Sequence, residues 1–492
     1  MSESAGSADS RFVLPFRIST RIAIAAGAIL LAALILRILG ADGDLWLDEL
    51  WSLKLIDEVK ARHDVFWGLA VDNNHYLNTL WLWVVGADAP VLLQRAFSIA
   101  LGVATVAAAG LALCRTGVAG MFCAMILFAV SYPMVNYGSE ARGYAGLILM
   151  TLLAILLTES ATAGSLRDRR RLGFVNLAAV LFQPIALGGI CGLILWSVWM
   201  NRPAAKPDFA ALRRLIVATE ATFSWTVRLL IPVAALITYA VLHAEGYRIA
   251  GTDPFTAAGF VAGYGGMLHL LLGLPDAAPD WVALLIGAGV CALGLLLARR
   301  RSPNFAALTF IFLVVLPLAM FIARLPNIHF PRYYLASAVV FLLVLADLFA
   351  AAWARGAVLR LLGAALLLAI AIGNLADVSR LLRDGRDQSA TVMKMIAGAG
   401  PVLVTSDQDV RNRPIVEFFA ARFDLPLTYV PTQEICAKQP EWLLSSSLDA
   451  EMPETLDTSI VGCPKIYRKE ASFPQWGLSG LPWTVYRAEH PQ

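Results

Sequence analysis

The stretch that decides the fold is the apolar run Ile22–Leu39, IAIAAGAILLAALILRIL, with the polar segment that follows it, Asp42–Leu53, DGDLWLDELWSL. The run is long enough to cross the hydrocarbon core of a membrane as an α-helix. Carboxylates therefore gather where the chain leaves the bilayer, at Asp42, Asp44, Asp48 and Glu49. A carboxylate pair at a membrane surface is costly to desolvate, so it usually binds or reacts with something. The alternative is a solvated loop anchored by its two tryptophans, whose rings favour the interface.

The composition of the chain is that of a membrane protein. Of its 492 residues, 58% are hydrophobic and only 15% are charged, whereas a soluble domain carries about 25% charged residues. The apolar residues fall in blocks of about 17 to 25, the length of a membrane-spanning helix. The net charge of +3 is too small to indicate a nucleic-acid partner. The sequence therefore predicts an α-helical polytopic membrane protein.

We predict eleven spans, at residues 20–40, 91–112, 118–134, 143–159, 172–183, 186–200, 228–243, 281–298, 304–323, 333–353 and 357–374. The fifth and sixth are short and are joined by Gln183-Pro184, so one long broken helix is an alternative. Charge decides between the two. With the N-terminus inside and eleven spans, the inner segments hold 18 lysines and arginines and the outer segments before residue 375 hold 7. Cytoplasmic loops carry such an excess of positive charge, and merging the two spans would destroy it.

Two outer segments are apolar without forming a predicted span. The segment 41–90 suits helices that lie in the plane of the interface. The run Phe260–Leu274 is short and interrupted by glycines, so we expect a re-entrant or interfacial piece.

The composition changes after Asn374, which divides the chain into a membrane domain, 1–374, and a second domain, 375–492. The second domain has no spanning run. We predict a small α/β domain on the outer, periplasmic face, with strands at 401–406, 427–430, 442–445 and 483–487 and a helix at 413–423. It holds no glycine-rich phosphate loop, so a supporting or acceptor-binding role is expected. An oxidising compartment would favour a disulfide between Cys436 and Cys463.

The polar motifs of the membrane domain all map to the outer face. They are DNNHYLN at Asp72–Asn78, NYGSEARGY at Asn136–Tyr144 and RLPNIHFPRYY at Arg324–Tyr334. Together with Asp48 and Glu49 they would open onto one side of one helical bundle. Ionisable residues at a membrane interface are functional candidates by default.

These residue types suit the transfer of a sugar from a lipid-linked phosphate. Guanidinium groups grip phosphate oxygens bidentately, and a carboxylate can take the proton of an attacking hydroxyl. An inverting displacement needs only that one base, with positive charge stabilising the departing phosphate.

At these motifs the chain resembles the GT-C class of polyprenyl-phosphate-sugar-dependent glycosyltransferases, a glycosyltransferase family 39-like group. The nearest branch is that of the bacterial protein O-mannosyltransferases and the aminoarabinose transferases of lipid A. The resemblance covers about 375 residues and is carried by Trp46-Leu47-Asp48-Glu49, Glu140-Ala141-Arg142-Gly143-Tyr144 and Pro331-Arg332-Tyr333.

The resemblance implies that Asp48 is the catalytic base, with Glu49 assisting or orienting it. It implies a donor site lined by Glu140 and Arg142, with Arg332 paired to the donor phosphate. Other candidates for substrate binding in the same motifs are Tyr144, Tyr333, His75, Asn78 and His329. Some relatives hold a divalent metal ion, for which Glu140 and His329 are the candidate ligands here. Two positions depart from the family pattern: Tyr76-Leu77 follows His75 where relatives often have two prolines, and Gln183 stands where many have a histidine.

The leading hypothesis is an integral glycosyltransferase of the bacterial inner membrane, with a cytoplasmic N-terminus. It would move a sugar from a polyprenyl-phosphate donor to a lipid, polysaccharide or protein acceptor on the periplasmic face. One alternative is a transporter or flippase of a lipid-linked sugar, although transporters tend to show internal repeats and charges at the bilayer midplane. Another is a non-catalytic subunit of an envelope polysaccharide assembly system.

Overall fold

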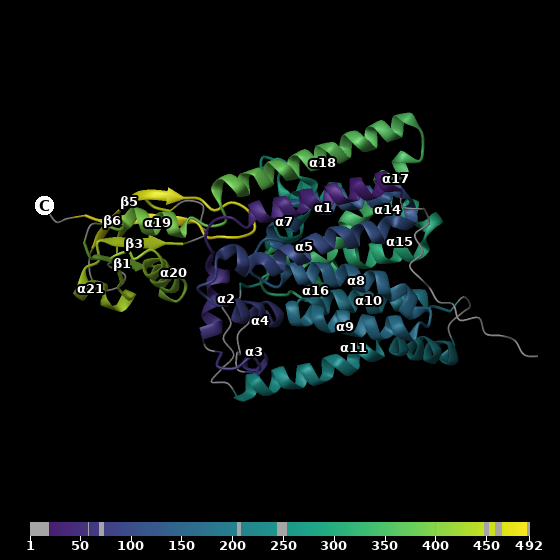
Figure 1. The fold of residues 1–492 in the computed structure, drawn as a ribbon, viewed down its shortest axis with the longest axis horizontal. Coiled ribbons are helices and arrows are strands. Elements are labelled where there is room, and N and C mark those ends of the chain that lie inside the picture. Colours follow the sequence, from purple (N-terminus) through teal and green to yellow (C-terminus); the bar gives the residue numbers. More distant parts are fainter. Residues whose placement is uncertain are drawn as a thin grey trace, which may run out of the picture.

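The computed structural model describes residues 19–57, 59–67, 73–203, 208–243, 253–398, 400–446, 452–457 and 465–489. Its long helices run side by side in one bundle, and a small sheet domain lies at one end of it (Figure 1). Each of the eleven predicted spans coincides with a helical segment: α1 Thr20–Gly40, α5 Val91–Leu113, α6 Val118–Val130, α8 Tyr144–Thr162, α9 Leu166–Phe182, α10 Ala186–Met200, α11 Phe209–His243, α14 Asp280–Arg301, α15 to α16 Pro303–Ile322 with a π-helical turn at Ile311–Val315, α17 Leu335–Trp353 and α18 Ala357–Asp384.

Within the described residues, 8 helices are long and apolar enough to cross a membrane. Three of the predicted spans fall short in length, since α6 has 13 residues, α9 has 17 and α10 has 15. The chain is thus a helical membrane protein with a small C-terminal sheet domain. The number of crossings stays a prediction.

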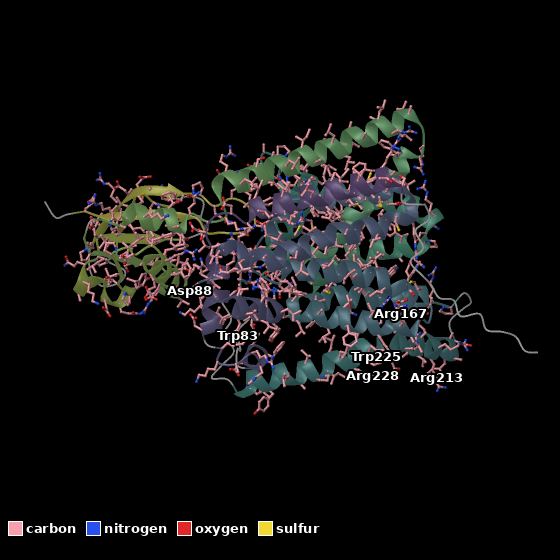
Figure 2. The ribbon with its side chains drawn as sticks, in the orientation of Figure 1. Trp83, Asp88, Arg167, Arg213, Trp225 and Arg228 are labelled. Carbon is pink, nitrogen blue, oxygen red and sulfur yellow. The ribbon has the colours of Figure 1, made fainter. Side chains whose placement is uncertain are left out.

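The two ends of the bundle differ in the way that the charge asymmetry predicts. Arg167 and Arg213, from segments predicted to be inside, lie at the end away from the sheet domain (Figure 2). Trp83 and Asp88, from a segment predicted to be outside, lie at the end that faces the sheet domain. The compartment that each end faces stays a prediction.

Helix α17 is the core of the bundle. Its sequence, LASAVVFLLVLADLFAAAW, is apolar on every side, as expected of a helix surrounded by others. The span that contains it is 83% buried, whereas those of α1 and α18 are only 11% buried. Outward-facing leucines and isoleucines of α1 and α18 suit contact with lipid.

Arg37 of α1 contacts the interruption between α6 and α7. The residue is fully buried, although an arginine near a helix end commonly extends to the lipid headgroups. Helix α6 ends at Val130 and the chain restarts as α7, Tyr132–Tyr137, which leaves the last carbonyls of α6 without helical partners. Arg37 Nη2 donates to Phe128 O at 3.0 Å and Nη1 to Ala129 O at 3.4 Å. The arginine therefore caps α6 and fixes the loop that follows.

Shorter helices cover the end of the bundle near the sheet domain. They are α2 Leu47–Asp57, α3 Asp64–Trp67, α4 Tyr76–Val85, and the short helix Ala257–Leu272 made of α12, a π-helical turn and α13. Figure 1 shows α2, α3 and α4 at this end of the bundle, and their place in the plane of the membrane interface stays a prediction. The piece expected to be re-entrant is this short helix at 257–272.

The C-terminal domain is a mixed sheet with the strand order β2-β1-β3-β6-β5-β4. Its elements are α19 Ser389–Ile396, β1 Val402–Ser406, α20 Asp409–Arg422, β2 Leu427–Tyr429, α21 Ile435–Lys438, β3 Trp442–Ser445, β4 Thr455–Asp457, β5 Ile466–Phe473 and β6 Trp483–Ala488. Strands β1, β2 and β3 are parallel, and β4, β5 and β6 are antiparallel to their neighbours. The four predicted strands and the predicted helix are confirmed, and β4 and β5 were not predicted.

The change of composition at Asn374 falls within α18, which continues to Asp384. The division of the chain at this residue stays a prediction. Cys436 is disulfide-bonded, and Cys463 lies outside the described residues.

Replacing Arg37 by methionine should lower the free energy of unfolding by about 1–3 kcal/mol, because buried carbonyls at the end of α6 lose their donor. Thermal unfolding in detergent measures the loss. The control is Arg21→Met, an exposed arginine of the same helix, which should leave the melting temperature nearly unchanged. Equal effects of the two substitutions would contradict the capping role.

Candidate active site

A cavity of about 1870 Å³ opens between the end of the bundle and the sheet domain. A pocket for a drug-sized molecule has about 300–1,000 Å³, so this one has room for more than one ligand. The sequence motifs supply one wall, through α2, the loop before α4, the loop before α8 and the 3-10 turn Pro331–Tyr334 before α17. The opposite wall comes from the sheet domain, through α20 and the loop 475–481.

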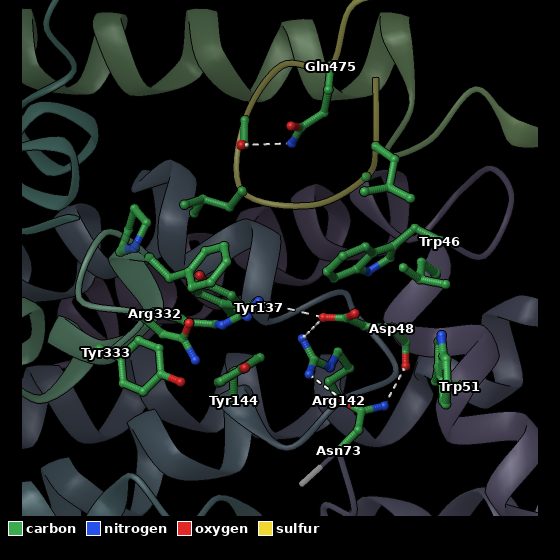
Figure 3. A pocket seen from close by; sticks show the side chains of 18 of the residues that line it. Trp46, Asp48, Trp51, Asn73, Tyr137, Arg142, Tyr144, Arg332, Tyr333 and Gln475 are labelled. Carbon is green, nitrogen blue, oxygen red and sulfur yellow. Dashed lines mark hydrogen bonds and ion pairs between the residues drawn. The ribbon is translucent and has the colours of Figure 1, made fainter. Parts of the chain in front are cut away.

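Asp48 stands in the first turn of α2 and projects into the cavity (Figure 3). Its Oδ2 lies 2.6 Å from Arg142 Nη1 and 3.6 Å from Arg332 Nη1. The side chain is 24% exposed. It is therefore a carboxylate paired to two guanidiniums and still open to a ligand.

Arg142 is held from several sides. Its Nη2 donates to Asn73 Oδ1 at 2.6 Å, and Asn73 in turn donates to the backbone carbonyl of Asp48 at 3.1 Å. The guanidinium also lies over the rings of Tyr144, at 4.8 Å, and Trp46, at 5.5 Å. Only 5% of the side chain is exposed, so Arg142 is a fixed part of the wall.

His75 is a neutral histidine held against the backbone of Gly143. Its Nδ1 accepts the Gly143 N–H at 2.8 Å, and its Nε2 lies 3.1 Å from Gln183 Nε2. Burial and the nearby Arg142 keep the pKa of His75 well below its usual value. A Cβ at Gly143 would lie 1.9 Å from the carbonyl oxygen of Phe182, so only glycine lets the backbone come this close.

Arg332 is the more exposed arginine of the pair. It lies in the 3-10 turn Pro331–Tyr334, its guanidinium 4.2 Å from the ring of Phe330. A quarter of its side chain is exposed, against 5% for Arg142. Tyr333 lies beside it and also lines the cavity. Arg332 can thus turn from Asp48 to an anionic ligand, whereas Arg142 cannot.

Glu49 does not line the cavity. It is fully buried, and both its oxygens accept from Arg95, at 2.8 Å from Nε and 2.6 Å from Nη2. Burial would raise the pKa of Glu49, but the Arg95 guanidinium brings it below its usual value. Arg95 also donates to the carbonyls of Ala41 and Asp44, so the pair frames the segment that carries Asp48. Removing one partner of such a pair costs about 3–5 kcal/mol.

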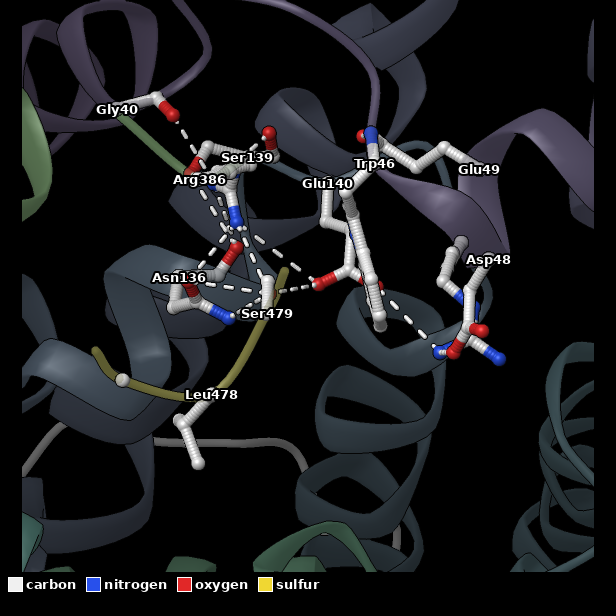
Figure 4. A network of polar contacts seen from close by, with 12 residues as sticks. Gly40, Trp46, Asp48, Glu49, Asn136, Ser139, Glu140, Arg386, Leu478 and Ser479 are labelled. Atoms are coloured by element: carbon white, nitrogen blue, oxygen red, sulfur yellow. Dashed lines mark hydrogen bonds and ion pairs between the residues drawn. The ribbon is translucent and has the colours of Figure 1, made fainter. Parts of the chain in front are cut away.

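Glu140 also stands behind the cavity wall (Figure 4). Its Oε2 accepts from Ser479 Oγ at 3.0 Å and lies 3.8 Å from Arg386 Nη1. Its Oε1 lies 3.6 Å from Arg142 Nη1 and accepts no hydrogen bond. Burial raises the pKa of Glu140 to about 7, against the opposing effects of Arg142 and Arg386.

The two remaining candidates lie outside the cavity wall. Asn78 is buried and donates to Ala141 O at 2.7 Å, which supports the loop of Arg142. His329 Nε2 lies 3.5 Å from Asp253 Oδ2. Burial lowers the pKa of His329, against the opposing effect of Asp253.

A divalent metal does not fit the donors that the structure brings together. In the ranges that it describes, no three histidine, cysteine or carboxylate side chains form a group that could hold a metal ion. The candidate ligands Glu140 and His329 belong to different networks, one on Arg386 and Ser479 and the other on Asp253. We assign no step to a metal.

Several residues of the site were missed by the sequence analysis. Arg95 could have been found, because an arginine at the start of an apolar span is a functional candidate by default. Arg386 gave no such signal, since it follows two other arginines in a charged segment. His269 lines the cavity with its ring 3.3 Å from Asp280, and it lies in a run predicted to be interfacial.

The sequence matches no protein-family model and no curated protein. Among solved structures, the chain is similar to ArnT from Cupriavidus metallidurans, bound to undecaprenyl phosphate and in the apo state. The identities are 13% and 12%, the TM-score is 0.47 for each, and each match covers 96% of this chain and 100% of the other. The likeness concerns the course of the backbone, and residue roles are argued from the site itself.

The Glu140 carboxyl should make stability depend on pH. Its pKa in the fold, about 7, exceeds the 4.5 of an unperturbed glutamate, so the folded state binds the extra proton between these values. The resulting stabilisation is present below pH 4.5 and is lost as the pH rises through 7. Relative to Glu140→Gln, the wild type should therefore lose up to about 3 kcal/mol between pH 5 and 8.

Thermal or denaturant unfolding in detergent at the two pH values measures this difference. The charged groups that act on Glu140 are Arg142, Arg386, Glu49 and Asp48, and all are kept in the variant. A constant difference between wild type and variant at the two pH values would contradict the raised pKa.

Proposed function

We propose that the chain is an integral membrane glycosyltransferase that moves a sugar from a polyprenyl-phosphate donor to a hydroxyl acceptor. The observation that carries the proposal is the placement of Asp48 between Arg142 and Arg332 in a large cavity at one end of a helical membrane bundle. Within this cluster two guanidiniums share one cavity-facing carboxylate, so one guanidinium charge has no cavity-facing partner in the cluster. A lipid-linked phosphate would supply the matching negative charge.

The location of the cavity fits a substrate that is half lipid and half water-soluble. It opens at the end of the bundle where α2 and α4 lie, and tryptophans 46 and 51 line it. Indole rings favour the level of the lipid headgroups, where a polyprenyl phosphate would present its sugar. In this arrangement the N-terminus is cytoplasmic and the sheet domain lies in the periplasm of a bacterial inner membrane.

The reaction is a single displacement with inversion. The acceptor oxygen attacks the anomeric carbon of the donor sugar, and the bond from that carbon to the phosphate oxygen breaks. Asp48 takes the proton of the attacking hydroxyl. Arg332 pairs with the phosphate as negative charge develops on it, while Arg142 holds Asp48 in place. The products are the glycosylated acceptor and the polyprenyl phosphate.

The resemblance implied that Glu49 assists or orients Asp48, and the contacts of Glu49 favour the orienting role. Because it is sealed against Arg95 away from the cavity, we assign it to positioning α2. Asp48 is then the one carboxylate of the pair that can reach a substrate.

Asp48→Asn should lower the release of polyprenyl phosphate by roughly 100-fold or more, because the amide cannot take a proton. The assay gives purified protein a panel of polyprenyl-phosphate sugars, with membrane extract as the source of acceptor. The matched control is Asp42→Asn, an exposed carboxylate six residues earlier that does not line the cavity. Full activity of Asp48→Asn would overturn the assignment of the base. Donor binding by wild type without any release would favour a transporter or an assembly subunit.

Arg332→Gln should raise the KM for the donor by roughly 10- to 100-fold, the equivalent of a charged hydrogen bond worth about 1.5–3 kcal/mol. Arg332→Lys should retain part of the affinity, since it keeps the charge and loses the planar fork. The control is Arg324→Gln, an exposed arginine of the same loop. An unchanged KM in Arg332→Gln would place the phosphate elsewhere.

A further inference from the structure

Arg386 connects the sheet domain to the loop that carries Arg142. It follows α18 by two residues, is fully buried, and is not part of the cavity wall. Its Nη2 donates to Gly40 O at 3.0 Å, to Asn136 O at 3.0 Å and to Ser139 O at 3.1 Å. One guanidinium thus ties the end of α1 to the loop between α7 and α8.

The loop between β5 and β6 meets the same point from the other side. Ser479 Oγ donates to Glu140 Oε2 at 3.0 Å and accepts from Asn136 Nδ2 at 3.0 Å. The backbone of Gly480 passes so close to Arg386 that an added Cβ would lie 2.0 Å from the Arg386 carbonyl oxygen. Figure 4 shows Arg386 and Ser479 converging on Asn136 and Glu140.

Glu140 connects Ser479 and Arg386 to Arg142 in the cavity wall. One of its oxygens faces Ser479 and Arg386, and the other lies 3.6 Å from Arg142 Nη1. The same Arg142 nitrogen lies 2.6 Å from Asp48 Oδ2. Without Arg386, Glu140 would have Arg142 as its remaining cation and would compete with Asp48 for it.

We propose that Arg386, together with Ser479, is a positioning residue that acts through Glu140 to hold Arg142 on Asp48. The junction between α18 and the sheet domain then sets the geometry of the reacting groups. This inference rests on the proposed transferase function, which it deepens by making the sheet domain part of the catalytic apparatus. Misplacement of a reacting group by about 1 Å can cost roughly 100-fold in rate.

The test compares Arg386→Gln, Arg386→Lys and Ser479→Ala with wild type in the full chain. Arg386→Gln should lower kcat by roughly 10- to 100-fold with little change in the donor KM, because Arg332 is untouched. Arg386→Lys should recover part of kcat, and Ser479→Ala should show a smaller loss. The matched control is Arg383→Gln, an exposed arginine of the same segment, which should behave as wild type.

A double-mutant cycle tests the route through Glu140. If Arg386 acts through it, the kcat loss of the double variant Arg386→Gln, Glu140→Gln is clearly smaller than the product of the two single losses. Losses that multiply would overturn the proposal. So would a stable Arg386→Gln protein with wild-type kcat, or a kcat loss that merely follows a lower melting temperature.

Hydrogen–deuterium exchange separates this inference from the proposed function. Amides in the segment 136–143 should exchange faster in Ser479→Ala and Arg386→Lys than in wild type or Arg383→Gln, whether or not a donor is turned over. If the wild type turns over no donor but the variants still exchange faster, the proposed transferase function is contradicted and the coupling through Arg386 is supported. Unchanged exchange in both variants would contradict the proposed coupling. The exchange of Ser479→Ala can still be measured if Arg386→Gln fails to fold.

Discussion

The arrangement of the site depends on the need to match buried positive charge with buried negative charge. Moving an ion out of water costs several kcal/mol, which only close, hydrogen-bonded partners offset. Arg142 meets this constraint with two carboxylates, Asp48 on the cavity side and Glu140 behind the wall. Because both contacts use Arg142 Nη1, a shift of one carboxylate changes the contact that the other makes with the same nitrogen.

The carboxylates around this point differ in access, and access separates their roles. Glu49 is closed off by two hydrogen bonds from Arg95, and Glu140 is closed off by Arg386 and Ser479. Asp48 alone among them reaches the cavity. The buried pairs fix the loops, and the exposed carboxylate is left to meet a substrate.

The sequence predicted the bundle well because membrane spans leave a strong signal. Apolar runs such as Ile22–Leu39 have few alternatives in a bilayer, and arginine placement orients them. The motif residues Asp48, Arg142 and Arg332 were also within reach, since ionisable groups near a membrane interface are rare and noticeable. The structure brings these three side chains together.

What the sequence could not show was the contact between distant segments. Nothing local distinguishes Arg386 or Ser479 from other polar residues of a charged domain. Their partner Asn136 is about 250 residues from one and about 340 from the other, and only the folded sheet domain places them together. The pairing of Glu49 with Arg95 left no local signal either, because the two residues come from different helices.

The most direct test of the account is a structure of the full chain with a bound polyprenyl phosphate. The account predicts the phosphate in the cavity, paired with Arg332 and facing Asp48. A phosphate bound outside this cavity, with the contact between Asp48 and Arg332 unchanged, would contradict it.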